Sequence, residues 1–137
     1  MLRIGAHSLI EEDEIIRMRF SGEISLSDIQ QVIARVDAVI ARHGGFGVIA
    51  EMRDASPLSL EARRYAVRWE NVRLGFGVAI VGANLVVRTL LSRAISIFRG
   101  DSLARLEFFK SESEAHEWLL QQRAEWNRRV TAKEIGQ

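Results

Sequence analysis

The sequence predicts a single α/β domain with a mixed five-stranded sheet and about four helices. Three observations support this fold class. The 137 residues are enough for one hydrophobic core and too few for two ordinary domains. Short, mainly apolar runs at 48–52 and 78–81 are typical of strands buried on both faces, and segments with helical periodicity separate the predicted strands. We expect the domain to cover residues 1–128, and residues 129–137 to form a frayed tail.

The N-terminal segment predicts an antiparallel hairpin of two strands, residues 2–10 and 15–21. In the second strand Ile16, Met18 and Phe20 alternate with arginines, which is the two-residue period of a strand with one buried face. The acidic turn at 11–14 is expected to be a solubilising loop. Its four carboxylates are consecutive and lack the alternating spacing of a calcium loop, so we expect no metal site.

A capping box predicts the start of the first helix. Ser25 is followed three residues later by Asp28, and each side chain can accept a hydrogen bond from the backbone N–H of the other. Gly44 and Gly45 predict the end of this helix, because glycine adopts the left-handed conformation without steric cost. A strand, a helix and a strand in this order predict a parallel pair of strands. The residues expected to face the core are Ile29, Val32, Ile33, Val36 and Ile40.

The central strand is expected to end at Arg53 and Asp54, where a polar loop, Asp54 to Ser59, leads to the second helix. In open α/β sheets ligands and partners bind at loops that follow central strands, so this loop is the first candidate site. Ser56 and Ser59 flank the only proline, Pro57, and either serine can cap the second helix. A phosphate on either serine would lie at a helix N-terminus near arginines, which makes both candidates for a phosphorylation switch.

The second helix is predicted to be amphipathic. Tyr65 and Trp69 lie one turn apart and bury a large area if they pack inward, whereas the alternatives are a dimer contact or a ligand platform. The expected apolar face comprises Ala62, Tyr65, Ala66, Trp69 and Val72.

Charge is distributed unevenly, although the net charge is only +1. Residues 1–61 contain 6 basic and 10 acidic side chains, whereas residues 62–137 contain 13 basic and 8 acidic ones. On the second helix the candidate interaction residues are Arg63, Arg64 and Arg68. Because the planar arginine fork fits phosphates and carboxylates, this segment is suited to an anionic partner. The alternative is that these arginines pair with the acidic N-terminal half across the fold.

A glycine-rich stretch surrounds the second apolar strand. Gly75 and Gly77 precede this strand and Gly82 follows it, so the spacing is not that of a dinucleotide-binding fingerprint. Backbone N–H groups near Gly82 can bind an anion, with Arg88 about one turn into the next helix. The alternative is an ordinary strand-to-helix turn that is capped by Asn84.

The third helix, residues 85–98, is mostly apolar and has only a narrow polar strip. So broad an apolar surface needs a cover besides the sheet, which can be another helix, a second subunit or a lipid. With a lipid, Arg88 or Arg93 would meet the acidic head group. A last strand at 106–109 and a final helix that begins after Ser111 complete the predicted fold.

Composition and motifs disfavour several functional classes. Without cysteine there is no disulfide, thiol nucleophile or thiolate metal site. No apolar run is long enough to span a bilayer, and the N-terminus lacks a signal-peptide pattern, so we expect a cytoplasmic protein. His7, His43 and His116 have neither metal-binding nor triad spacing and are expected to be surface or helix-end residues. We expect no cofactor and no nucleic-acid partner.

Five segments together resemble the SpoIIAA-like group of the STAS superfamily: FSGEIS, MRDA, SLEARRYAVRW, VAIVGANLVVRTL and FFKSESEAHEWL. The resemblance covers residues 15–120 and rests on the order and spacing of these segments. It implies a mixed five-stranded sheet with four helices, related to the CRAL-TRIO lipid-transfer fold, and a protein that is not an enzyme. In the anti-sigma-factor antagonists of this superfamily, a serine within an Asp-Ser-Ser-Gly turn is regulatory. Residues 53–59 of this chain lack that motif.

The leading hypothesis is a non-enzymatic regulatory or protein-interaction module, a homodimer, that acts on a protein partner through the loop Asp54–Ser59 and the arginine-bearing second helix. The alternative is a carrier or sensor of a lipid-like, anionic ligand held under helix 85–98. The ligand-binding candidates are Tyr65, Trp69, Gly82, Asn84, Arg88 and Arg93.

Overall fold

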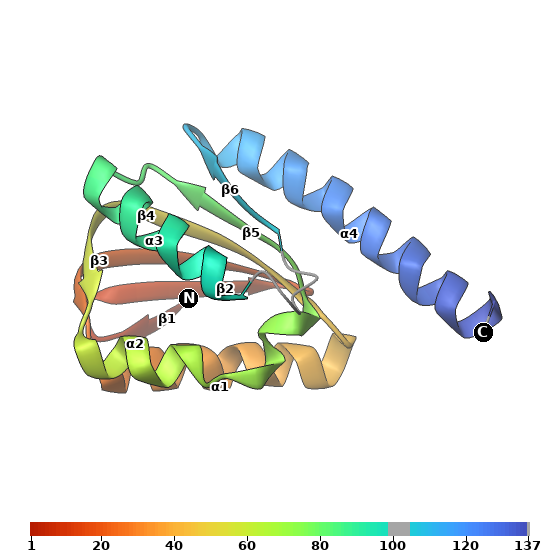
Figure 1. The fold of residues 1–137 in the computed structure, drawn as a ribbon, viewed down its shortest axis with the longest axis horizontal. Helices are drawn as coiled ribbons and strands as arrows, with labels where there is room; N and C mark the ends of the chain where they lie inside the picture. The colour runs from red at the N-terminus through yellow and green to blue at the C-terminus, as the bar shows by residue number, and fades with distance from the viewer. Residues whose placement is uncertain (99–104, 137) are drawn as a thin grey trace.

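The computed structural model describes residues 1–98 and 105–136, without the side chains of residues 91, 93–98 and 133–136. Within these residues six strands form one sheet in the order β1-β2-β3-β4-β5-β6 (Figure 1). The strands are β1 (Leu2–Ile4), β2 (His7–Glu12), β3 (Ile15–Ile24), β4 (Phe46–Leu58), β5 (Gly75–Val81) and β6 (Leu106–Phe109). The helical elements are α1 (Leu26–His43), α2 (Leu60–Val67), the 3-10 helix η1 (Glu70–Leu74), α3 (Leu85–Phe98) and α4 (Glu112–Gly136).

The predicted α/β fold class is confirmed, but the predicted number of five strands is wrong. The segment expected to be one strand, residues 2–10, reverses at Gly5 and Ala6 and forms β1 and β2, which pair antiparallel. Gly5 has a φ of 58°, a conformation that glycine adopts without strain. A Cβ at Gly5 would also lie only 2.9 Å from Oδ1 of Asp28. Glycine is therefore favoured at this reversal. The sequence pattern gave no separate period for so short a strand.

The rest of the sheet has the predicted mixed pairing. β2 and β3 form the expected antiparallel hairpin, and β3, β4, β5 and β6 pair parallel to their neighbours. The connections between the parallel strands contain α1, α2 with η1, and α3, in chain order. The carboxyl ends of β4, β5 and β6 therefore lie at one edge of the sheet, where α2, α3 and α4 each begin (Figure 1).

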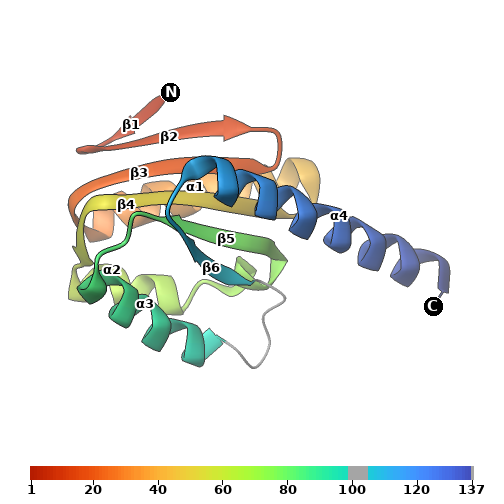
Figure 2. The same ribbon diagram turned by 90° about the horizontal axis from the view of Figure 1, so that it is seen from above.

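Helices cover both faces of the sheet (Figure 2). Val36 of α1 and Val87 of α3 pack into the larger core on one face, and α2 lies against α1 on the same side. On the opposite face α4 packs through Ala115 and Leu119 against Ile49 and neighbouring residues. Both faces of the first part of β4, residues 46–52, are thus buried, as the apolar sequence of this part predicted.

The predicted limits of α1 are confirmed by its caps. The Oγ of Ser25 accepts a hydrogen bond from the N–H of Asp28, and Asp28 accepts one from the N–H of Ser25, each at 3.1 Å. Gly44 ends the helix with a φ of 82° and donates its N–H to the carbonyl of Ile40. The buried residues of α1 are Val32, Ile33, Val36 and Val39.

Gly-Phe-Gly segments, residues 45–47 and 75–77, lie at the starts of β4 and β5. A Cβ at Gly47 would overlap the ring of Phe76, and a Cβ at Gly75 would lie 2.9 Å from the ring of Phe46. Each phenylalanine therefore packs over a glycine of the neighbouring strand, Phe46 in one core and Phe76 in the other. These glycines make room for aromatic packing in the sheet.

The second and fourth helices differ from the predicted pattern. A single apolar face from Ala62 to Val72 was expected, but α2 ends at Val67 and only Ala62 of this helix is buried. Trp69 is extended, with φ −73° and ψ 115°, and η1 follows it. α4 continues to Gly136, so helical backbone extends through most of the segment that was expected to fray.

Candidate functional site

The candidate site is the surface formed by the end of β4 and by α2. The loop predicted at Asp54–Ser59 is wrong, because β4 continues to Leu58. Its pairing with β3 absorbs two extra residues: the partners advance from Arg19 and Glu51 to Ser21 and Asp54, and a second shift follows before Leu58. Such β-bulges bend and twist a strand without ending it, and they occur often near functional sites.

The buried carboxylate of Glu51 accepts a hydrogen bond from a backbone N–H group in the first bulge. Glu51 is only 8% exposed, and its Oε1 accepts a hydrogen bond from the N–H of Arg53 at 2.9 Å. A Cβ at Gly82 would lie 2.9 Å from the same oxygen, so the glycine leaves the space that this carboxylate needs. Sequence analysis missed Glu51. A single acidic residue inside an otherwise apolar strand was the available signal.

The two candidate serines have different environments. Ser59 caps α2, because its Oγ accepts a hydrogen bond from the N–H of Ala62 at 3.1 Å. The N–H of Ser59 also donates to the carbonyl of Ile24 at 3.0 Å, which ties the start of α2 to the end of β3. Ser56 and Asp54 are exposed on the last part of β4. Of the two serines, Ser59 is therefore the helix cap.

The arginines of α2 and of its C-cap project into solvent. Arg63, Arg64 and Arg68 are exposed, and none of them forms an ion pair within the described residues. Within the described residues, none of these three arginines pairs with the acidic N-terminal half, which was the alternative. Among the N-terminal carboxylates, Glu11, Glu12 and Glu14 pair with other arginines.

The acidic turn is an ion-paired junction and not merely a solubilising loop. Glu11 contacts Arg35 at 2.9 Å and Arg42 at 2.7 Å, and both arginines lie on α1. The hydrogen bond from Arg42 lowers the pKa of Glu11 and, with the charge of Arg35, outweighs the opposing effect of burial. Glu14 contacts Arg123 of α4 at 3.2 Å. The turn thus links the hairpin to helices on both faces of the sheet.

The structure separates the predicted aromatic pair. Trp69 donates its Nε1–H to Oδ1 of Asp37 at 3.0 Å and packs on Phe46, with ring centroids 5.5 Å apart. Asn71 donates to the same oxygen at 2.9 Å. Tyr65 instead is 38% exposed on α2. The prediction that Tyr65 and Trp69 share one apolar helix face is wrong, because the helix ends before Trp69. The indole of Trp69 instead bonds to α1.

At the start of α3 the backbone N–H groups of Gly82 and Val87 have acceptors. The N–H of Gly82 donates to the carbonyl of Phe109 at 3.3 Å, and the N–H of Val87 donates to Oδ1 of Asn84 at 2.9 Å. The geometry is therefore that of the alternative, a turn with an Asn84 cap. The guanidinium of Arg88 lies 4.7 Å from the ring centre of Phe108, a cation–π contact.

The apolar surface predicted on α3 is only partly buried. Val87 is buried, whereas Leu85 and Val86 are 80% and 62% exposed. The side chain of Arg93, a ligand-binding candidate, lies outside the described residues.

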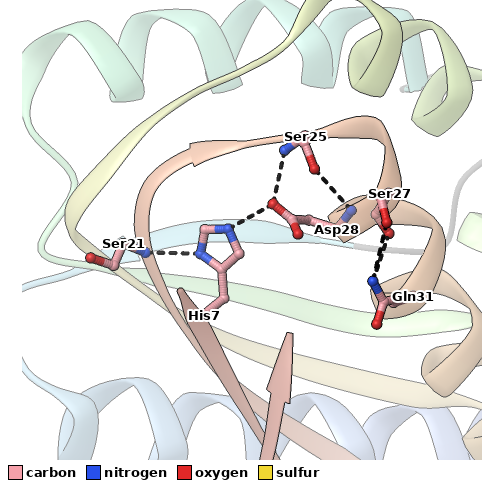
Figure 3. Close-up of polar contacts among 6 residues, drawn as sticks. All are labelled: His7, Ser21, Ser25, Ser27, Asp28 and Gln31. Atoms are coloured by element: carbon pink, nitrogen blue, oxygen red, sulfur yellow. Dashed lines mark hydrogen bonds and ion pairs between the residues drawn. The ribbon is translucent and has the colours of Figure 1, made fainter. Parts of the chain in front are cut away.

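A polar cluster that sequence analysis missed lies around His7 (Figure 3). His7 is 2% exposed, so its prediction as a surface or helix-end residue is wrong. Its Nδ1 accepts the N–H of Ser21 at 3.0 Å, and its Nε2 lies 3.1 Å from Oδ2 of Asp28. Since Nδ1 is an acceptor, the hydrogen bonds assign the proton to Nε2, which donates to Asp28. The available signal of its burial was its position two residues before Leu9, on the same face of the strand.

The cluster contains the residue types of a catalytic triad but not the geometry. Ser21 contributes its backbone N–H, and the hydroxyl of Ser25 caps the N–H of Asp28, so neither hydroxyl is shown on the imidazole. Burial raises the pKa of Asp28, but hydrogen bonds from Ser25 and His7 outweigh this effect and lower it. The cluster joins β2, the end of β3 and the start of α1, immediately beside the Ser21–Asp54 pairing.

No group of three or more His, Asp or Glu side chains in residues 1–98 and 105–136 is placed to hold a metal ion. In the same part of the chain, no helix has both the length and the apolar character needed to cross a membrane.

Solved structures with similar folds were found at low sequence identity. An uncharacterized protein of the DUF3478 family with a SpoIIAA-like fold, from Shewanella loihica PV-4, is 18% identical, with a TM-score of 0.61 and coverage of 83% of this chain and 92% of that chain. The anti-sigma factor antagonist SpoIIAA in its unphosphorylated form is 14% identical, with a TM-score of 0.52 and coverage of 83% and 97%. The Bacillus cell fate determinant SpoIIAA in the phosphorylated form is 14% identical, with a TM-score of 0.50 and coverage of 83% and 99%.

A comparison with curated proteins found no significant match. The SpoIIAA-like family model matches residues 15–120, which is most of the 137-residue chain. The three solved structures agree with this match in fold. The protein belongs to the SpoIIAA-like family.

Proposed function

We propose that this protein is a non-enzymatic regulatory module that binds an acidic surface of a protein partner through α2 and the end of β4. The observation that carries the proposal is the exposure of Arg63, Arg64 and Arg68, without an ion pair in the described residues. Membership of the SpoIIAA-like family supports it, since one structure of similar fold is named an anti-sigma factor antagonist.

Exposed arginines favour an acidic protein for a physical reason. Each guanidinium presents several donors in a planar fork that matches a carboxylate, and arginine is enriched at protein interfaces. A cluster of three speeds association with an oppositely charged surface and makes the rate sensitive to salt. We therefore expect a partner that binds more weakly as the salt concentration rises.

Within this site Ser56 is the serine that we propose for a phosphorylation switch. It is exposed on β4, whereas the hydroxyl of Ser59 is already used as the cap of α2. A phosphate on Ser56 would place negative charge beside the arginine surface and reduce its attraction for an acidic partner. A structure of similar fold, the Bacillus cell fate determinant SpoIIAA, is described in a phosphorylated form, which supports phosphorylation as the kind of switch.

The alternative, a carrier of an anionic apolar ligand under α3, has one observation in its favour. Leu85 and Val86 are exposed beside Arg88 at the start of that helix. A surface hollow of about 290 Å³ lies between β1, β2 and α1, which is a different place. Native mass spectrometry of the protein from its own host tests the carrier function, which requires an added mass that organic solvent releases. The same spectrum reads the subunit number and so tests the predicted homodimer.

The interaction function is tested by capture from the host with a charge-reversed protein. In the test variant Arg63, Arg64 and Arg68 become glutamate. In the control variant Arg3, Arg19 and Arg128, which are exposed on other elements, are changed in the same way. We expect the specific partner to be lost with the test variant and retained with the control. Retention by both variants, or loss with both, would contradict the assignment to α2.

A further inference from the structure

We infer that the partner surface has an apolar centre bordered by carboxylates, and that Leu60 and Val67 of α2 are the residues that contact this centre. The inference rests on the proposed function, because it adds the chemistry of the partner to the same site. Leu60 is 51% exposed and Val67 is 48% exposed.

The two side chains form one ridge along the outside of α2. Successive residues of an α-helix are about 100° apart, so Val67 lies about 20° from the direction of Leu60. Ala62 lies about 160° from Leu60 on the same geometry, and it is fully buried. The ridge of Leu60 and Val67 is therefore opposite the face that packs on the protein.

Arginines border this ridge on both sides. From the direction of Leu60, Arg63 lies about 60° to one side, and Arg64 and Arg68 lie about 40° and 80° to the other. Protein interfaces commonly combine a dehydrated apolar centre with a polar rim, and this arrangement of residues matches that anatomy. A single exposed leucine is ordinary, whereas two large apolar residues on one line between cations are a more specific feature.

Charge complementarity identifies the occupant as a protein surface with a carboxylate rim. The ridge arginines form no ion pair within the described residues, including with Glu61, the only acidic residue of α2. A bilayer is disfavoured, because two apolar side chains on a helix of 8 residues bury too little area for stable membrane attachment. The rim carboxylates would meet the arginines, while apolar side chains would cover Leu60 and Val67.

Synthetic helical peptides provide the probe. The first peptide carries two leucines seven residues apart with glutamates at the positions between and beside them. The second has glutamine in place of the leucines, and the third has glutamine in place of the glutamates. Binding is measured by isothermal titration calorimetry, and the contact site by amide chemical shifts of the full chain. We expect the first peptide to shift the resonances of α2 and to bind at least tenfold more tightly than the other two.

Two matched variants of the protein complete the experiment. Leu60→Gln with Val67→Gln removes the ridge, and Leu85→Gln with Val86→Gln is the control, since that pair is exposed on α3. All four side chains are exposed, and circular dichroism checks that both variants are folded. We expect affinity for the first peptide to fall at least tenfold in the ridge variant and to stay unchanged in the control.

The outcomes separate this inference from the proposed function. Peptide binding can be abolished by changing Arg63, Arg64 and Arg68 to glutamate and yet be unaffected in the ridge variant. In that case the inference of an apolar centre is wrong, whereas the proposal of an acidic partner stands. If neither change affects binding, both proposals fail at this surface. Absence of binding by the first peptide overturns the inference. Ridge-dependent binding to phosphatidylglycerol vesicles in preference to the peptide also overturns it.

Discussion

Nε2 of His7 lies 3.1 Å from Oδ2 of Asp28, and this contact joins strand β2 to the first turn of α1. The same carboxylate oxygen accepts the N–H of Ser25, and the imidazole accepts the N–H of Ser21. One buried histidine thus connects the hairpin, the helix start and the segment of β3 that pairs with Asp54.

Asp28→Ala is expected to destabilise the protein by about 2–3 kcal/mol, because it removes half of a capping box and leaves the buried Nε2–H of His7 without its acceptor. Urea unfolding followed by circular dichroism measures the change. Ser27→Ala is the control, since Ser27 is exposed on the same turn and its hydroxyl accepts a hydrogen bond from the Gln31 side chain. A loss of equal size in both variants would contradict the role given to the His7 cluster.

Stability is expected to fall in acid, with Asp28 and Glu11 contributing. The pKa of each lies below its ordinary value, 3.8 for Asp28 and 4.5 for Glu11. A lowered folded-state pKa stabilises the protein above the ordinary value, and this stabilisation is lost as the pH falls through the folded-state pKa. The free energy of unfolding should therefore decline below about pH 4.5. Asp28→Asn should decline less steeply than the wild type, and parallel curves would exclude a contribution from Asp28.

Gly47→Ala is expected to cost about 3 kcal/mol of stability, since the new Cβ overlaps the ring of Phe76 in a packed core. Gly44→Ala is the comparison. Its Cβ would meet no atom within 4 Å, so the only cost is that of placing alanine in the left-handed conformation, about 1–2 kcal/mol of stability. Adding Phe76→Leu should recover part of the loss in the Gly47 variant. No recovery would show that ring overlap is not the cause.

Glu51→Ala is expected to destabilise the protein by about 1–2 kcal/mol, because the N–H of Arg53 in the bulge loses its acceptor. Glu51→Gln keeps an oxygen at the same position and should cost less. Thermal unfolding compares the two variants, and amide exchange at Arg53 reports the bulge directly. Equal exchange rates in wild type and Glu51→Ala would contradict the hydrogen bond.

Sequence signals within one element, such as caps and apolar runs, were sufficient to predict several helices and strands. The capping box and Gly44 set the limits of α1, and the apolar runs located β4 and β5. The order of elements was sufficient to indicate the SpoIIAA-like family, which the family model confirms.

Features that depend on contacts across the sheet could not be predicted. The bulges of β4 are defined by its pairing with β3, which is distant in the sequence. Within residues 52–58, no sequence pattern separates a bulged polar strand from a loop. α2 ends before Trp69, whose indole bonds to Asp37, a residue 32 positions away in the sequence. The burial of His7 depends on Ser21 and Asp28, which only the folded chain brings together.

A photo-crosslinking amino acid at position 64 in the full chain, activated in the host cell, tests whether α2 contacts a protein partner. The same amino acid at position 128 is the control, because Arg128 is equally an exposed arginine, on α4. We expect a discrete crosslinked product from position 64 that is absent from position 128 and lost when Arg63 and Arg68 are changed to glutamate. The same product from both positions, or none from position 64, would contradict the proposed contact.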